Sequence, residues 1–101
     1  MGSNSPRSEE KVAAIAVRIF GKRECDICKT ATENINRYLS EIRHKIETFH
    51  YDMDTLDGLT EAAVHSAFDV PTIIIEKDRK EIRRWKSLPP AEEFINVCSC
   101  L

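Results

Sequence analysis

Two cysteines, Cys25 and Cys28, stand two residues apart at the point where a strand-like stretch gives way to a helical one. Before them, Val12–Phe20 is rich in β-branched and apolar residues and stops at Gly21, which is typical of a strand buried on both faces. Helical spacing begins directly after the pair. The cysteines therefore mark the junction between a buried strand and a helix, which favours a fold of the α/β class.

The helix that follows is predicted from apolar residues at intervals of three and four. These residues are Ile27, Ala31, Ile35, Tyr38, Leu39, Ile42 and Ile46. The basic residues Arg43, His44 and Lys45 come near the end of this pattern and suit the negative end of a helix dipole. We therefore expect the helix to close at this basic cluster.

The rest of the chain alternates between strand and helix signals. The elements expected are a strand over 49–53, a helix over 59–68, a hairpin of strands over 72–75 and 81–86, and a last helix that starts at Pro89 and Pro90. A strand–helix–strand opening requires a right-handed crossover and a parallel pair of strands. The order β-α-β-α-β-β-α thus predicts an α/β fold in which helices flank a four-stranded mixed sheet.

Length and charge limit the classes of function. With 101 residues, the chain fits one compact domain, which we place at 12–101 after a flexible polar leader at 1–11. The longest apolar runs, Val12–Val17 and Val70–Ile75, are far shorter than the roughly 20 residues that span a bilayer. The net charge of −2 gives no broad field for nucleic acid or an anionic membrane. We expect a monomer that binds neither.

Cysteine usage indicates a compartment and a chemistry. The leader lacks the apolar stretch of a secretory signal, so we expect a cytoplasmic protein whose four cysteines are reduced. Paired cysteines in that setting are more often catalytic or metal-binding than structural. The Cys25 thiol, close to the unpaired N–H groups of a helix start, is the candidate nucleophile. Cys28, one helical turn later, would resolve the mixed disulfide with a substrate.

Charged neighbours act on the nucleophilic thiol in both directions. Lys22, Arg23 and Lys29 favour the thiolate, whereas Glu24 and Asp26 oppose it. We expect only a mild lowering of its pKa. A weakly stabilised thiolate favours the disulfide form, so we predict a potential typical of a reductant rather than of a strong oxidant.

Three short motifs carry a resemblance to a known family. They are Cys25–Cys28 after the first strand, Asp52–Asp54 at the end of the second, and Val70–Thr72 at the start of the third. In these residues the chain resembles the thioredoxin superfamily from about Val12 to Phe94, and its size and short first strand make the glutaredoxin-like members the nearer likeness. The resemblance implies a thioredoxin fold and a thiol–disulfide oxidoreductase that needs no cofactor.

The resemblance also implies roles for individual residues. Pro71 would be cis and lie against the active-site disulfide, and Val70 would offer its backbone to the substrate. Together with Asp26 and Ile27, between the two cysteines, they would form the substrate-binding surface. The implied partners are a disulfide-bearing protein or small molecule and a reductant, either a reductase or glutathione. Thioredoxins bury an acidic residue where this chain has Ile19, so no carboxylate serves as a proton relay there.

A second cysteine pair leaves an alternative open. Cys98 and Cys100 could join the first pair as four thiolate ligands of a structural zinc ion, or the fold could serve only for binding. The spacing from Phe94 instead predicts that Cys98 is a small core residue. The charged run Glu76–Arg84 is interpreted as a solvated hairpin. The three histidines show no ligand spacing and are interpreted as surface or strand residues.

Overall fold

The computed structural model describes residues 15–43 and 45–101, so the predicted leader, residues 12–14 of the predicted domain and His44 lie outside the described residues. Seven elements follow one another in the predicted order. They are β1 (Ile15–Gly21), α2 (Asp26–Leu39), β2 (Ile46–Asp52), α3 (Leu56–His65), β3 (Thr72–Lys77), β4 (Lys80–Trp85) and α4 (Ala91–Ser99). No helix among these residues has the length and apolar character needed to cross a membrane.

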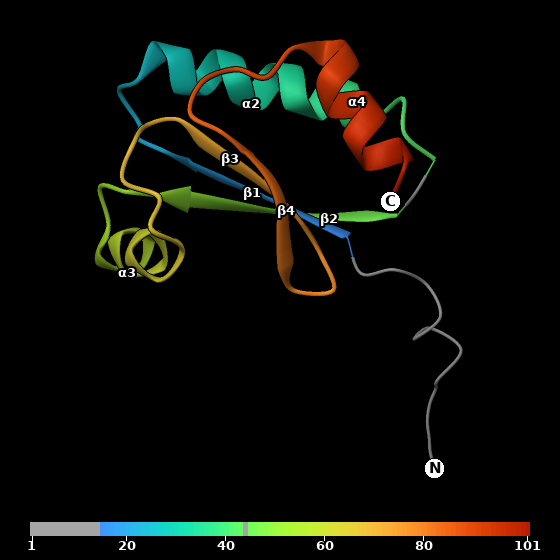
Figure 1. The fold of residues 1–101 in the computed structure, drawn as a ribbon. Helices are drawn as coiled ribbons and strands as arrows, with labels where there is room; N and C mark the ends of the chain where they lie inside the picture. The colour runs from blue at the N-terminus through green and yellow to red at the C-terminus, as the bar shows by residue number, and fades with distance from the viewer. Residues whose placement is uncertain (1–14, 44) are drawn as a thin grey trace.

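The four strands form one mixed sheet with the order β2-β1-β3-β4. β1 runs parallel to β2, and Ile15 lies opposite Ile46. β3 is antiparallel to both of its neighbours. The predicted α/β class and the four-stranded mixed sheet are confirmed (Figure 1).

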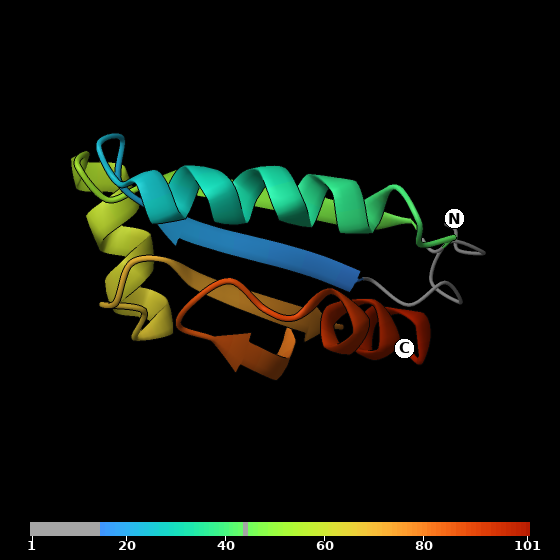
Figure 2. The ribbon, with the colours of Figure 1, turned by 90° about the horizontal axis from the view of Figure 1, so that it is seen from above.

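Helices cover both faces of the sheet, α2 and α4 on one and α3 on the other (Figures 1 and 2). Because side chains alternate along a strand, β1 and β3 contribute to two cores. The larger core joins Ile35 of α2 and Phe94 of α4 to strand residues such as Val17 and Ile75. The smaller core lies under α3 and includes Phe20 and Ile74, among others.

The predicted end of the first helix is wrong. α2 stops at Leu39, where the Ser40 hydroxyl donates a hydrogen bond to the Arg37 carbonyl oxygen. Ile42 continues the helical spacing but lies in the following turn, where it is still buried. Ile46 already belongs to β2, because pairing with the full length of β1 extends that strand backwards. The basic cluster therefore follows the helix and does not close it.

Other boundaries shift by a few residues. α3 begins at Leu56, three residues earlier than predicted, because Thr55 caps it by accepting the Gly58 N–H. The last helix begins at Ala91 with Pro90 as its N-cap. The predicted hairpin is present, but the prediction that its charged run is solvated is wrong at Glu76, which is only 6% exposed. Its side chain faces the smaller core and pairs with Arg18 of β1.

Candidate active site

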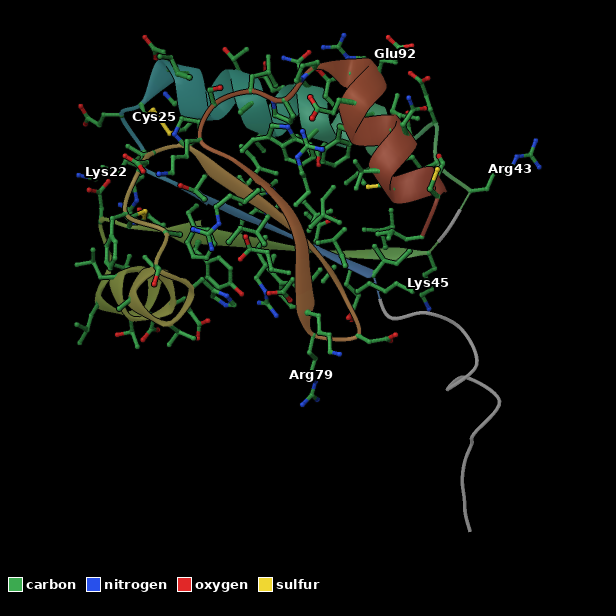
Figure 3. All side chains as sticks on the ribbon, viewed as in Figure 1. Lys22, Cys25, Arg43, Lys45, Arg79 and Glu92 are labelled. Atoms are coloured by element: carbon green, nitrogen blue, oxygen red, sulfur yellow. A yellow bond between two sulfur atoms is a disulfide. The ribbon has the colours of Figure 1, made fainter. Side chains whose placement is uncertain are left out.

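Cys25 is the N-cap residue of α2, in the loop that follows β1 (Figure 3). Its sulfur accepts a hydrogen bond from the Cys28 backbone N–H at 3.1 Å, so a free N–H group of the first helical turn points at this sulfur. The Lys29 N–H donates to the Cys25 carbonyl oxygen and closes the first turn. The start of the helix thus holds the Cys25 sulfur where partial positive charge favours a thiolate.

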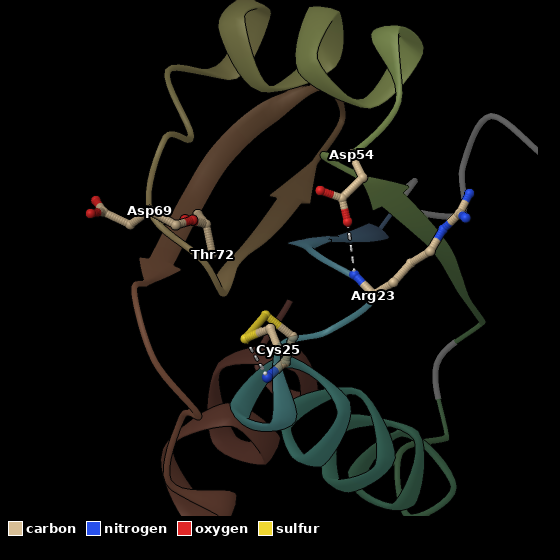
Figure 4. The surroundings of a disulfide bond; sticks show 6 residues. Arg23, Cys25, Asp54, Asp69 and Thr72 are labelled. Atoms are coloured by element: carbon tan, nitrogen blue, oxygen red, sulfur yellow. Dashed lines mark hydrogen bonds between the residues drawn. A yellow bond between two sulfur atoms is a disulfide. The ribbon is translucent and has the colours of Figure 1, made fainter.

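Cys25 and Cys28 form a disulfide, with their Cα atoms 5.1 Å apart (Figure 4). Cys25 is partly exposed, whereas Cys28 is 5% exposed and packs against the end of β1. A Cβ atom at Gly21 would lie 3.0 Å from Cys28 Cβ and 3.1 Å from its sulfur. A glycine at this position therefore leaves room for the inner cysteine, and only the outer sulfur is open to a substrate.

The loop between β1 and Cys25 is tied to the end of β2. The Arg23 N–H donates to an Asp54 carboxylate oxygen at 3.2 Å, and the Arg23 guanidinium donates to Asp52 at 2.5 Å (Figure 4 shows the first contact). The Met53 N–H donates to the Gly21 carbonyl oxygen. These bonds fix the position of the loop, and hence of the cysteine that follows it.

The same contacts act on the two charged partners. The Asp54 backbone N–H and the Arg23 guanidinium lower the pKa of Asp52 below its ordinary value. The hydrogen bond and charge of Asp52 raise the pKa of Arg23. Both groups therefore stay charged through the neutral range, and the contact between the loop and β2 persists there.

The loop from α3 into β3 passes beside the start of α2 (Figures 1 and 4). The Val70–Pro71 peptide bond is cis. Pro71 is buried and Val70 is partly buried. Thr72 pairs with Phe20 at the end of β1, so the cis proline lies at the same edge of the sheet as the disulfide.

The structure brings the sequence-predicted site residues to one edge of the molecule. Asp26 and Ile27 lie on the outer surface of the first turn of α2, and the Ile27 side chain is 62% exposed. Val70 and Pro71 directly precede Thr72, which pairs with Phe20 at the end of β1 that leads to the disulfide. The binding roles assigned to these four residues, and the catalytic roles of the two cysteines, stay predictions.

The second cysteine pair lies elsewhere. Cys98 is fully buried in the larger core, as its spacing predicted, and burial raises the pKa of its thiol to about 11. Cys100 is free and exposed. Within residues 15–43 and 45–101, no three His, Cys, Asp or Glu side chains gather in a group that could hold a metal ion. The geometry thus gives no support to a zinc site built from four thiolates.

Sequence reasoning missed two parts of this site. One is the tie between Arg23 and the Asp52–Asp54 segment, and the other is a cavity behind Cys28 that also contains His50. Both depend on residues brought together from separate strands and loops. Gly21 carried the one available signal, since a glycine directly after a strand often marks a close approach.

No family model and no curated protein matches the chain. Several solved structures do match it. The thioredoxin of Fasciola hepatica is 24% identical, with 89% of this chain and 86% of that chain covered and a TM-score of 0.72. Mitochondrial thioredoxin 3 of Saccharomyces cerevisiae, in its oxidized form, is 17% identical, with 94% and 86% covered and a TM-score of 0.72. Thioredoxin-2 of a malaria parasite is 20% identical, with 84% and 81% covered and a TM-score of 0.72.

These likenesses define the class of protein. The chain has the thioredoxin fold, with a Cys-x-x-Cys pair at the start of the first helix of that fold. Identities of this size show a shared fold and not a shared substrate. The three neighbours are thioredoxins, so the nearer likeness to glutaredoxins stays a prediction from the sequence.

Proposed function

We propose that this protein is a thiol–disulfide oxidoreductase in which Cys25 attacks a substrate disulfide and Cys28 resolves the product. The observation that carries the proposal is the asymmetry of the pair. The Cys25 sulfur is partly exposed and accepts a helix N–H, whereas the Cys28 sulfur is buried within bonding distance of it. A nucleophile needs access and a stabilised thiolate, and a resolving thiol needs only proximity.

Four residues form the proposed substrate surface. Ile27 gives an exposed apolar contact beside the attacking sulfur, and Asp26 adds a charge next to it. Val70 precedes the cis Pro71 on the other side and offers backbone groups to an extended segment of the substrate. A disulfide-bearing protein or small molecule would bind between these two sides, with its sulfur above Cys25.

The electron donor and the setting belong to the same proposal. We propose a monomer that is reduced in the cytoplasm, either by a reductase or, as in glutaredoxins, by glutathione. The two unlinked cysteines, Cys98 and Cys100, support a reducing compartment. Reduction of the oxidised protein by glutathione alone, compared with reduction by a purified reductase system, distinguishes the two donors.

The decisive experiment equilibrates the protein in thiol–disulfide buffers of graded potential, traps free thiols by alkylation and locates them by mass spectrometry. We expect one reversible two-electron transition in which Cys25 and Cys28 lose their labels together. Its midpoint should lie nearer to the about −270 mV of reducing members of this fold than to the about −120 mV of the strongly oxidising ones.

Single variants assign the roles. Cys25→Ser should abolish reaction with a disulfide-bearing peptide, whereas Cys28→Ser should accumulate a stable mixed disulfide at Cys25. Cys100→Ser is the matched control and should leave both steps unchanged. If Cys25 and Cys28 remain unlinked at every potential, the oxidoreductase assignment is wrong and the fold serves for binding.

A further inference from the structure

A cavity of about 530 Å³ is lined by Cys28 and by none of the four residues of the proposed substrate surface. Its walls are the first turns of α2 and the ends of β1 and β2. Ile19 and Gly21 line it from β1, Cys28 lines it from α2, and His50 lines it from β2. Ile19 and His50 are direct neighbours in the parallel pair of strands, so both side chains lie on the sheet face that α2 covers.

The cavity gives the inner cysteine a route to water. Cys28 is 5% exposed, and it lines the cavity together with Gly21, against which it packs. When the pair is reduced, Cys28 must lose its proton before it can attack, because the thiolate and not the thiol is the nucleophile. A proton that leaves this sulfur towards the cavity needs an acceptor within the cavity or in the solvent beyond it.

The residues that line the cavity limit which group can accept the Cys28 proton. Ile19, which lines the cavity with Cys28, is apolar. The remaining ionisable groups that face the cavity are Lys22, Arg23, Lys29, Glu33, His50, Tyr51 and Asp52. Lysine, arginine and tyrosine side chains ordinarily keep their protons at neutral pH, and carboxylates ordinarily accept one only near pH 4. An imidazole is the side chain whose ordinary titration falls near neutral pH.

One of the two carboxylates in the cavity is held in an ion pair. Asp52 is paired with Arg23 at 2.5 Å, and its pKa is lowered by the Asp54 N–H and by Arg23. Glu33 belongs to the second turn of α2, beyond Cys28. General base catalysis is most effective when the ordinary pKa of the base is close to the working pH. His50 is therefore the best matched base among the described residues that line the cavity.

We infer that His50 accepts the Cys28 proton through water in this cavity when the mixed disulfide is resolved. The inference rests on the proposed function and adds a residue to it. The proton of the Cys28 thiol passes to an imidazole nitrogen, and the resulting thiolate attacks the Cys25 sulfur. The Cys25–Cys28 bond forms, the bond from Cys25 to the substrate breaks, and the substrate sulfur leaves with the electron pair as a thiolate. His50 then returns its proton to solvent.

The geometry predicts that His50 acts in only one of the two steps, the resolution by Cys28. His50 lines the cavity with Cys28, and Cys25 is not among the lining residues. Loss of the imidazole should therefore slow resolution and leave the first attack unchanged. Imidazole is the kind of side chain in this cavity whose ordinary titration range lies between about pH 5 and 8, so the pH dependence of the second step in that range, the two thiols aside, tests the role of the imidazole.

The test follows the reduced full-length chain, in a Cys100→Ser background, with an aromatic disulfide that releases one coloured thiolate in each step. Stopped-flow absorbance then separates the attack by Cys25 from the resolution by Cys28. We expect His50→Gln to slow the second phase about tenfold or more at pH 7 and to alter its pH profile. Added imidazole should restore the rate in a His50→Ala variant. Glu33→Gln, which changes another residue of the same cavity, should leave both phases unchanged.

Each outcome decides a separate question. If His50→Gln leaves the second phase and its pH profile unchanged, solvent is the acceptor and the inference is wrong. Equal slowing by Glu33→Gln also overturns it, because the shape or charge of the cavity would then be responsible. A parent protein that shows only the first phase would instead refute the resolving role of Cys28, and with it the proposed function.

Discussion

The buried thiol of Cys98 differs from the other free thiol in its surroundings. The Cys98 side chain is fully buried in the larger core, and burial raises the pKa of its thiol to about 11. At pH 8 only about one molecule in a thousand then carries a Cys98 thiolate. We expect alkylation of the reduced native protein at pH 8 to label Cys100 rapidly and Cys98 very slowly, as measured by mass spectrometry. Labelling in urea, where both thiols are exposed, provides the control.

The same burial predicts a pH dependence of stability. In the unfolded chain this thiol ionises near its ordinary pKa of 9.0, whereas in the folded protein it ionises near 11. The unfolded state therefore loses its proton first, and the free energy of unfolding should fall as the pH rises from 9 to 11. The difference between the wild type and Cys98→Ala isolates this contribution from other groups. A constant difference over that range would contradict the assignment.

Individual residues also show which parts of the site could be predicted from the sequence and which could not. The roles proposed for Cys25 and Cys28 follow from their spacing and from a strand before them, which are local properties of the sequence. His50 gave no such signal, because its place in the cavity that Cys28 also lines depends on the pairing of β2 with β1. A residue that acts across two strands becomes visible only when their register is known.

Among the elements, α3 is fixed at its start by a glycine. A Cβ atom at Gly58 would lie 1.9 Å from the Asp52 carbonyl oxygen, so the first turn of α3 touches the end of β2. Helix propensity alone predicts that alanine here would stabilise the helix by about 1 kcal/mol. We expect the opposite, a loss of about 1–3 kcal/mol in the free energy of unfolding for Gly58→Ala, because backbone must move.

Urea denaturation measures the effect of the Gly58 substitution. Thr60→Ala in the same helix is the matched control, since Thr60 is exposed, and it should change the stability by less than about 0.5 kcal/mol. A more stable Gly58→Ala protein would show that α3 does not abut β2 in solution.

The other end of α3 is held by a residue of β4. The Arg84 guanidinium donates to the Ser66 carbonyl oxygen at 3.0 Å and to that of His65 at 2.8 Å, where the helix has unpaired carbonyls. Glu81 orients the guanidinium and raises the pKa of Arg84. Arg84→Ala should cost about 1–2 kcal/mol and speed amide hydrogen exchange in the last turn of α3.

A neighbouring arginine provides the comparison for this prediction. Arg83 pairs with Glu93 and is about half exposed, so Arg83→Ala should cost less than about 1 kcal/mol and leave the exchange of α3 unchanged. If the two substitutions had equal effects on stability and on hydrogen exchange, Arg84 would act only through its charge and not through its hydrogen bonds to the end of α3. Arg84→Lys, which keeps the charge but loses the fork of donors, should fall between the wild type and alanine.

The order of the elements could be predicted from the sequence, but the ends of some helices and strands could not. The order of strands and helices follows from periodicity, which each segment carries in its own sequence. Ile42 and Ile46 continue the helical spacing of α2, yet one packs from a turn and the other from β2. The start of β2 is set by its pairing with β1, and no local sequence pattern could reveal this start.

For the molecule as a whole, the two faces of the sheet differ in polarity. The buried core under α2 and α4 is formed by hydrophobic side chains, whereas Arg18 and the buried Glu76 lie on the face under α3. Arg18 donates to Glu76 at 3.0 Å and to the Tyr51 hydroxyl oxygen, and its guanidinium lies 4.8 Å from the centre of the Phe49 ring. These contacts join β1, β2 and β3 beneath α3. The sequence predicted a solvated Glu76 because this residue begins a run of charged residues, and its neighbours Lys77–Lys80 are exposed or partly exposed.

This polar cluster should be sensitive to the loss of one partner. Burial opposes the charged form of Arg18, but the hydrogen bond and charge of Glu76 outweigh it and raise the pKa of Arg18. Glu76→Gln keeps the shape of the side chain and leaves the Arg18 charge half-buried without its counterion. We expect it to lower the free energy of unfolding by about 2–4 kcal/mol, measured by urea denaturation.

A double substitution separates pairing from packing in this cluster. If charge burial causes the loss, replacing both partners in Arg18→Met with Glu76→Met should destabilise the protein less than the sum of the two single substitutions, because no unpaired charge remains. Lys80→Ala, at an exposed position in the adjoining β4, is the control and should change stability by less than about 0.5 kcal/mol. Strict additivity of the two single effects would mean that Arg18 and Glu76 contribute separately to the α3 face, and that their contact does not couple β1 to β3.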